Sequence, residues 1–155
     1  MRREGALAGV RTDIQRAALL FGVVFLVVTL AGFIPGITTD YGDLTRFDGE
    51  GAKIFGIFGT NILENLVHLL YGVAGLVAAS SWAASKVYFI WGGVVYLAVW
   101  LYGLLGGSDE SSSANVLGLN SAADWLHFVL GVTMIAVGFV LSRRVSRDRA
   151  ATTAT

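Results

Sequence analysis

Four long apolar segments constrain this chain more than any other feature of its sequence. They cover residues 17–36, 62–82, 87–105 and 122–142, and none carries more than one charged side chain. A helix of about 20 apolar residues crosses the roughly 30 Å hydrocarbon core of a bilayer. Hydrophobic residues make up 55% of the 155-residue chain and charged residues only 14%, which is too apolar for a water-soluble domain of this length. The sequence therefore predicts an all-α fold, a bundle of four transmembrane helices in a multi-pass membrane protein.

The charged residues flank these segments asymmetrically. Arginines gather in the N-terminal segment 1–16 and in the basic tail 143–155, and Lys86 lies in the turn between the second and third segments. The connections 37–60 and 106–115 are acidic instead. Because positively charged flanks stay on the cytoplasmic side, both termini are predicted to be cytoplasmic, in the inner or plasma membrane of the cell.

The first of these connections is predicted to end in two local structures. Ile54 to Phe58 is apolar and is expected to form a short helix on the membrane surface. Asn61, which directly precedes the second apolar segment, is expected to cap that helix. An asparagine side chain at this position accepts a hydrogen bond from a free amide of the first helical turn.

One sequence motif occurs twice. The stretch NILENLVHLLYGV, Asn61–Val73, returns as NSAADWLHFVLGV, Asn120–Val132, and the shared pattern is G-x-N-x3-[N/D]-x2-H-x3-G-V. His68 and His127 occupy the same place in the two copies, 59 residues apart. This offset predicts an internal duplication.

The duplication extends weakly to the preceding apolar segments. At an offset of 70 residues, Phe21 and Gly22 pair with Trp91 and Gly92. Each repeat is then one helical hairpin. Because a hairpin returns the chain to the side of the membrane on which it started, the repeats are predicted to be parallel, related by a pseudo-two-fold axis along the membrane normal.

Both copies of the motif place polar and small residues on one face of a helix, because residues three and four apart are neighbours there. The candidate polar site consists of Asn61, Glu64, Asn65, His68, Asn120, Asp124 and His127. The candidate helix-packing positions are Gly72, Gly75, Gly131 and Gly138. Polar groups are costly in lipid, so we expect both sets to face the interior of the bundle. Leucine at Gly72 or Gly131 is expected to disrupt the fold more than leucine at Gly22.

The simplest interpretation of the two histidines is structural. Each imidazole would hydrogen-bond an asparagine, an aspartate or a backbone carbonyl of a neighbouring helix, while the glycines let the helices approach closely. Such bonds contribute about 0.6–2 kcal/mol each. This interpretation predicts a non-enzymatic structural or accessory protein, assembled as a homo-oligomer or within a larger membrane complex.

Two other interpretations remain open. In the first, a redox or ligand-binding protein, His68 and His127 ligate a haem b, with a glycine one turn below each histidine making room for the macrocycle. A metal ion held by these histidines, Asp124 and Glu64 is a variant of the same idea. In the second, Glu64, Asp124 and the histidines form the external vestibule of a small oligomeric transporter for protons or small cations.

Several function classes are excluded by what the sequence lacks. It contains no cysteine, which removes thiol–disulfide exchange, thiolate metal sites and covalently attached c-type haem. It contains no G-x-S-x-G, P-loop, H-E-x-x-H or protein-kinase motif, so no enzyme class is indicated. The expected partner is the lipid bilayer and not nucleic acid.

The two motif copies also carry a family resemblance. In GTNILENLVHLLYGVAGL and GLNSAADWLHFVLGV the chain resembles a bacterial, largely actinobacterial, family of small four-span membrane proteins that is known as a domain of unknown function. The resemblance covers most of the chain, from the first apolar segment to the fourth. It implies a four-helix inner-membrane protein and supplies no activity. Asp124 departs from it, because the family often has an asparagine-bearing version there, and this puts in doubt any role that needs a neutral amide.

Overall fold

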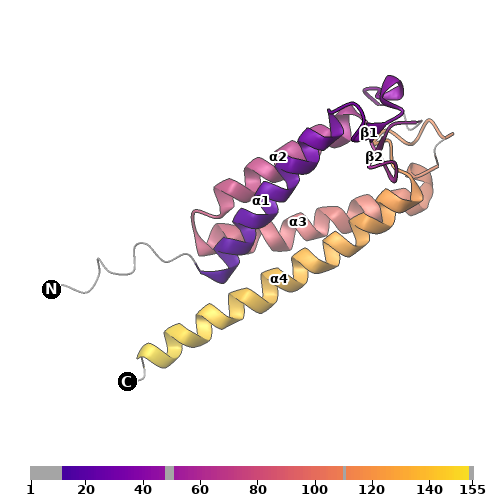
Figure 1. Cartoon of the computed structure of the whole chain (residues 1–155). Coiled ribbons are helices and arrows are strands. Elements are labelled where there is room, and N and C mark those ends of the chain that lie inside the picture. The colour runs from indigo at the N-terminus through magenta and orange to yellow at the C-terminus, as the bar shows by residue number, and fades with distance from the viewer. Residues whose placement is uncertain (1–11, 48–50, 110, 154–155) are drawn as a thin grey trace.

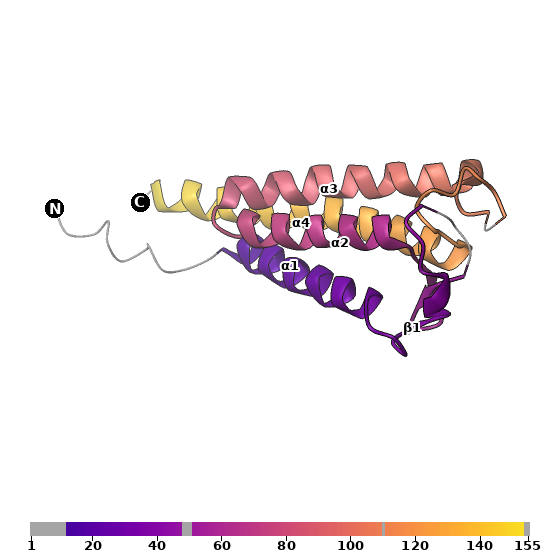
Figure 2. The same cartoon turned by 90° about the horizontal axis from the view of Figure 1, so that it is seen from above.

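The structure, a computed structural model, describes residues 12–47, 51–109 and 111–153. Within them the chain is mostly helical, with the helices α1 (Asp13–Gly32), α2 (Ile62–Ala78), α3 (Trp82–Tyr102) and α4 (Ser121–Thr153). The helices run roughly along one direction (Figures 1 and 2). The start of α1 and the end of α4 lie at one end of the molecule, and the longer loops lie at the other (Figure 1).

The two ends of the chain are only partly described. Of the predicted N-terminal segment 1–16, residues 1–11 lie outside the described residues. The last helix, α4, continues to Thr153, so the described part of the basic tail 143–155 is helical.

In the part of the chain that the structure describes, three helical segments are long and apolar enough to cross a membrane. They are Asp13–Gly32, Trp82–Gly107 and Ser121–Arg143, and the second of them joins α3 to a π-helical turn, η2 (Gly103–Gly107). The remaining helix, α2, is also apolar but has only 17 residues. Its outer face carries exposed apolar side chains such as Leu70 and Val77, which are 69% and 65% exposed. Together these features indicate a membrane protein.

The boundary between α2 and α3 differs from the prediction. The predicted segments 62–82 and 87–105 leave a turn around Lys86, whereas α2 ends at Ala78 and α3 already begins at Trp82. The reason is a cap: the Ser81 side chain accepts a hydrogen bond from the backbone N–H of Ala84 and so starts the new helix.

Glycines set how closely α1 and α2 approach. A Cβ atom on Gly22 would lie 2.8 Å from the backbone nitrogen of Leu76 and 2.9 Å from the carbonyl oxygen of Gly72. One on Gly75 would lie 2.8 Å from the Cα of Gly22. The two backbones therefore touch along this line. The expectation that Gly22 tolerates leucine better than Gly72 is wrong, because a Cβ atom on Gly22 would meet the backbone of α2, whereas one on Gly72 would first meet the flexible side chain of Leu26.

A similar contact occurs between α3 and α4. A Cβ atom on Gly93 would lie 2.7 Å from the carbonyl oxygen of Gly131 and 3.1 Å from the backbone nitrogen of Ile135. By these contacts Gly22 corresponds to Gly93, 71 residues later, and not to Gly92 as the offset of 70 predicted. The offset of 70 pairs Phe21-Gly22 with Trp91-Gly92, because each glycine follows an aromatic residue. The backbone contacts instead show that Gly93 is the glycine that faces the partner helix.

In their described residues, the loops at the other end contain three short strands and one 3-10 turn: β1 (Thr38–Thr39), η1 (Tyr41–Asp43), β2 (Lys53–Ile54) and β3 (Phe58–Gly59). The strands pair antiparallel in the order β1-β2-β3. The predicted surface helix over Ile54 to Phe58 is therefore wrong. The turn between β2 and β3 places Phe55 and Gly56 at φ of +56° and +70°, a left-handed conformation that ends helix and strand alike.

Aromatic rings fill the interior between the two helix pairs. Phe25 of α1, Tyr71 of α2 and Tyr96 of α3 meet with ring centroids 4.7 to 5.8 Å apart. Tyr88 and Phe89, near the start of α3, continue this cluster.

Candidate functional site

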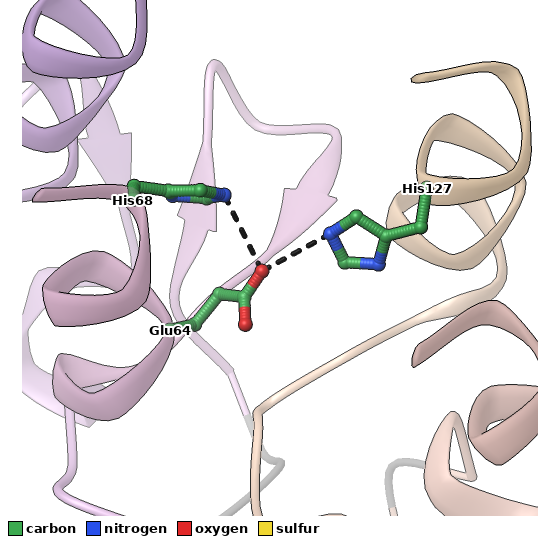
Figure 3. Close-up of side chains that lie close together, drawn as sticks. All are labelled: Glu64, His68 and His127. Carbon is green, nitrogen blue, oxygen red and sulfur yellow. Dashed lines mark ion pairs between the residues drawn. The ribbon is translucent and has the colours of Figure 1, made fainter. Parts of the chain in front are cut away.

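Three buried side chains converge between the helix pairs. The Nε2 atoms of His68 and His127 lie 3.3 Å and 3.1 Å from one carboxylate oxygen, Oε1 of Glu64 (Figure 3). The three potential ligand atoms all lie within 4.8 Å of one another. None of the three residues is more than 9% exposed. We call these residues the polar centre.

The polar centre joins helices that are distant in sequence. Glu64 and His68 are four residues apart on α2 and share one face of that helix, whereas His127 comes from α4 (Figure 3). The carboxylate is therefore a direct link between the first helix pair and the second. Sequence reasoning had placed all three residues among the candidate polar positions.

Ring packing orients the two imidazoles. Phe25 stacks on His68 with ring centroids 5.9 Å apart, and Tyr96 lies 5.1 Å from His127. Within the described part of the chain, neither buried Nδ1 atom has a hydrogen-bond partner. Contacts with aromatic rings, rather than hydrogen bonds to Nδ1, thus direct both Nε2 atoms towards Glu64.

A cavity of about 390 Å³ lies beside the polar centre. Glu64, His68 and His127 contribute to its wall, and the remaining lining is almost wholly apolar. That lining includes Leu20 and Val24 of α1, Leu126 and Leu130 of α4, and Phe55 and Phe58 of the strand hairpin. Its size falls within the range of about 300–1,000 Å³ that is usual for small-molecule sites.

The candidate residues Asn61 and Asn120 are structural. Each caps a helix: Asn61 accepts from the backbone N–H of Glu64, and Asn120 from that of Ala123. Each also reaches across to the loop before the other helix, since the Asn61 amide donates to the carbonyl of Val116 and the Asn120 amide to that of Ile57. The two asparagines thus fasten the helix pairs together at the loop end.

Asn65 and Asp124 occupy the same place in the two motif copies but have different surroundings. The Asn65 amide donates to the carbonyl of Gly32 at 3.3 Å. Asp124 faces Gly103 in the same way, yet its buried Oδ1 has no hydrogen-bond partner among the described residues. The structure does not bring Asp124 to the polar centre, so a four-residue ligand set that includes it is not formed.

One comparison with known proteins gives a match. The profile of a protein family, the domain of unknown function DUF4383, matches residues 15–140, a range that contains the polar centre and the cavity-lining residues. The chain belongs to this family. DUF4383 carries no assigned activity, so membership leaves the molecular function unknown. No curated protein and no solved structure matches the chain.

The packing glycines of this DUF4383 chain lie where helices touch rather than at the polar centre. A Cβ atom on Gly72 or Gly131 would lie within 2.8 Å of a leucine side chain of the partner helix, Leu26 or Leu97. One on Gly138 would lie 2.9 Å from the Cγ1 of Ile90. These positions bring α1 close to α2 and α3 close to α4.

Sequence reasoning missed the residues that surround the polar centre. Phe25 and Tyr96 lie inside uniformly apolar segments, and nothing in the local pattern distinguishes them from lipid-facing aromatics. Asn115, at the end of the acidic connection 106–115, was also missed: it is buried and exchanges two hydrogen bonds with the backbone of Leu119. A buried asparagine of this kind organises the loop before α4.

Proposed function

We propose that this DUF4383 protein spans the cell membrane four times, with both termini on the cytoplasmic side. At about 1.5 Å per residue, the 17 residues of α2 extend about 26 Å, slightly less than the hydrocarbon thickness, and a bilayer thins locally to match such a helix. The packing of α2 against α1 along the glycine contact supports its assignment as a span. Arginine and lysine residues at the end where α1 starts support the orientation.

The contacts between helices support an origin by duplication. Gly22 meets Gly72 and Leu76 in the first pair, and Gly93 meets Gly131 and Ile135 in the second. The reciprocal asparagine bonds follow the same relation, because each donates to the carbonyl four residues before the other asparagine. Two parallel hairpins related by a pseudo-two-fold axis along the membrane normal account for both sets of contacts.

Our functional proposal is that the polar centre binds a divalent transition-metal ion of the zinc class. The observation that carries it is the convergence of two imidazole nitrogens on one carboxylate oxygen. Tetrahedral coordination with bonds of about 2.0–2.1 Å separates neighbouring donor atoms by about 3.3 Å. The nitrogen–oxygen distances at the polar centre, 3.3 Å and 3.1 Å, match that separation.

The donor set also fits a site with one open position. Two histidines and one glutamate are a recurrent three-ligand set for zinc, in which the fourth position is left to water or to a ligand. The cavity beside the polar centre provides space for that fourth ligand. A haem between the histidines fits less well, since the Glu64 oxygen touches both Nε2 atoms and stands where the iron and its macrocycle would lie.

Titration of the purified, metal-free protein with Zn²⁺ in detergent, followed by calorimetry, tests this proposal. We expect one equivalent of Zn²⁺ for the wild type. His127→Ala and Glu64→Gln each remove a ligand, so their affinities should fall by more than the about 10–100-fold that is typical for loss of an outer-shell partner. Asp124→Asn changes a buried carboxyl group outside the polar centre and serves as the matched control.

Size-exclusion chromatography and circular dichroism establish that each variant is folded before its titration. Folded His127→Ala and Glu64→Gln proteins that bind Zn²⁺ as tightly as the wild type would contradict the proposal. So would a folded wild-type protein that binds no Zn²⁺.

A further inference from the structure

We infer that the cavity beside the polar centre binds a single-chain amphiphile with a carboxylate head group, the chemical class of a long-chain fatty acid. The carboxylate takes the open position of the metal ion, and the acyl chain fills the apolar cavity. This inference rests on the proposed metal site and names the ligand that completes it.

The lining of the cavity suits an acyl chain. Apart from the polar centre, the described lining residues are apolar, and they come from α1, α4 and the strand hairpin. Phe55 and Phe58 cover the cavity at the loop end. A ligand with several polar groups would leave most of them without hydrogen-bond partners there, whereas a hydrocarbon chain needs none.

The cavity has an apolar, exposed wall formed by α1 and α4. Leu20 and Val24 on α1 and Leu126 on α4 line it and are still 61%, 49% and 37% exposed. All three belong to segments that are long and apolar enough to cross a membrane. The opening therefore lies between α1 and α4 at the lipid-facing surface, and a ligand dissolved in the membrane reaches it laterally.

Charge selects the head group. Among the described lining residues, Glu64 is the only aspartate, glutamate, lysine or arginine. A divalent cation bound to one carboxylate and two neutral imidazoles leaves the centre with one uncompensated positive charge. Such a charge is costly in apolar surroundings, and an anionic donor neutralises it. A carboxylate meets this need, while an ester or a sterol hydroxyl does not.

Fluorescence of cis-parinaric acid, a fatty acid whose emission rises in apolar sites, provides the test. The probe is titrated into Zn²⁺-loaded and metal-free wild-type protein, and palmitate or its methyl ester then competes for the site. We expect saturable binding of one probe molecule to the loaded protein. Removal of the metal, or of the competitor's charge, should weaken binding by about tenfold or more, as expected for loss of a charge-assisted contact.

Two neighbouring valines of α1 give a matched pair of variants. Val24 lines the cavity, whereas Val23 is similarly exposed and does not line it. Val24→Trp should fill the cavity and weaken probe binding by about tenfold or more, with one equivalent of Zn²⁺ still bound. Val23→Trp should behave as the wild type in both measurements.

The outcomes separate the two proposals. Suppose that the wild type binds one equivalent of Zn²⁺. Equal probe affinity of the wild-type and Val24→Trp proteins would then overturn the fatty-acid inference alone, and so would equal competition by palmitate and its methyl ester. If the ligand were instead a lipid with two acyl chains, phosphatidic acid would compete with the probe and palmitate would not. That result would also overturn the inference. Failure of the wild type to bind Zn²⁺ would overturn both.

Discussion

Adjacent glycines on α3 should respond very differently to the same substitution. A Cβ atom on Gly93 would meet backbone, lying 2.7 Å from the Gly131 oxygen, whereas one on Gly92 would lie 2.7 Å from the Cε of Met134, the free end of a flexible side chain. Ordinary contacts of a Cβ atom begin at 3.4 Å, so Gly93→Ala must push α3 and α4 apart by about 0.7 Å. Gly92→Ala requires Met134 to change its rotamer and the Tyr71 ring, whose Cε1 would lie 3.3 Å from the new Cβ atom, to shift slightly, while the helix backbones keep their spacing.

The difference in stability between the two variants can be estimated because one contribution is the same in both. Both substitutions gain about 1 kcal/mol of helix propensity, so this gain drops out of the comparison. What remains is the overpacking cost at Gly93, about 1–3 kcal/mol. For a chain of this size, a difference of about 2 kcal/mol lowers the melting temperature of Gly93→Ala by about 4–8 °C relative to Gly92→Ala.

Tryptophan fluorescence during thermal unfolding in detergent measures this difference. Gly42→Ala is a control for the procedure, because Gly42 is exposed and a Cβ atom there would meet nothing within 4 Å. Equal melting temperatures for the Gly92 and Gly93 variants, or the reverse order, would refute the idea that backbone contact at Gly93 sets the spacing of α3 and α4.

The same assay tests two further positions. Asn120→Ala loses a helix cap and a hydrogen bond to the opposite helix pair, so it should lower the free energy of unfolding by about 2–3 kcal/mol. Ser81→Ala loses only a helix cap and should lower it by about 1 kcal/mol. Equal losses would show that the link between the helix pairs contributes nothing. Asp124→Asn should stabilise the protein by about 1 kcal/mol, because a neutral amide costs less to bury than a carboxylate whose Oδ1 has no hydrogen-bond partner among the described residues. A lower melting temperature for Asp124→Asn would mean that the carboxylate has a partner of its own.

The helices could be predicted because their determinants are local. Long apolar runs define α1, α3 and α4, and Asn61 caps α2 as its position before the apolar run predicted. Helical periodicity also puts Glu64 and His68 on one face of α2 without any knowledge of the tertiary structure.

The loop end could not be predicted from local pattern. The hairpin over this segment pairs Ile54 with Phe58 through a turn at positive φ, and β2 also pairs with β1, where Ile54 lies opposite Thr38, 16 positions earlier. The apolar character of Ile54 to Phe58 indicates neither the turn nor this longer-range pairing. The turn between α2 and α3 was misplaced for a different reason. Trp82 is apolar and reads as a continuation of the second segment, although the cap at Ser81 makes it the first residue of α3.

The candidate site was only half visible in the sequence. A repeated motif implies that His68 and His127 have equivalent surroundings, but the carboxylate between them comes from one copy alone, since Ala123 stands where the first copy has Glu64. The cavity has no sequence signature at all. It arises because α1, α4 and the strand hairpin meet through apolar residues that look like any lipid-facing positions.

X-ray absorption at the zinc edge of the Zn²⁺-loaded wild-type protein reports the ligands of the ion itself and so tests whether the polar centre holds it. We expect two imidazoles and at least one oxygen at about 2.0–2.1 Å, with one imidazole lost in His127→Ala. A spectrum that shows only oxygen ligands, or one that His127→Ala leaves unchanged, would contradict a metal site built by Glu64, His68 and His127.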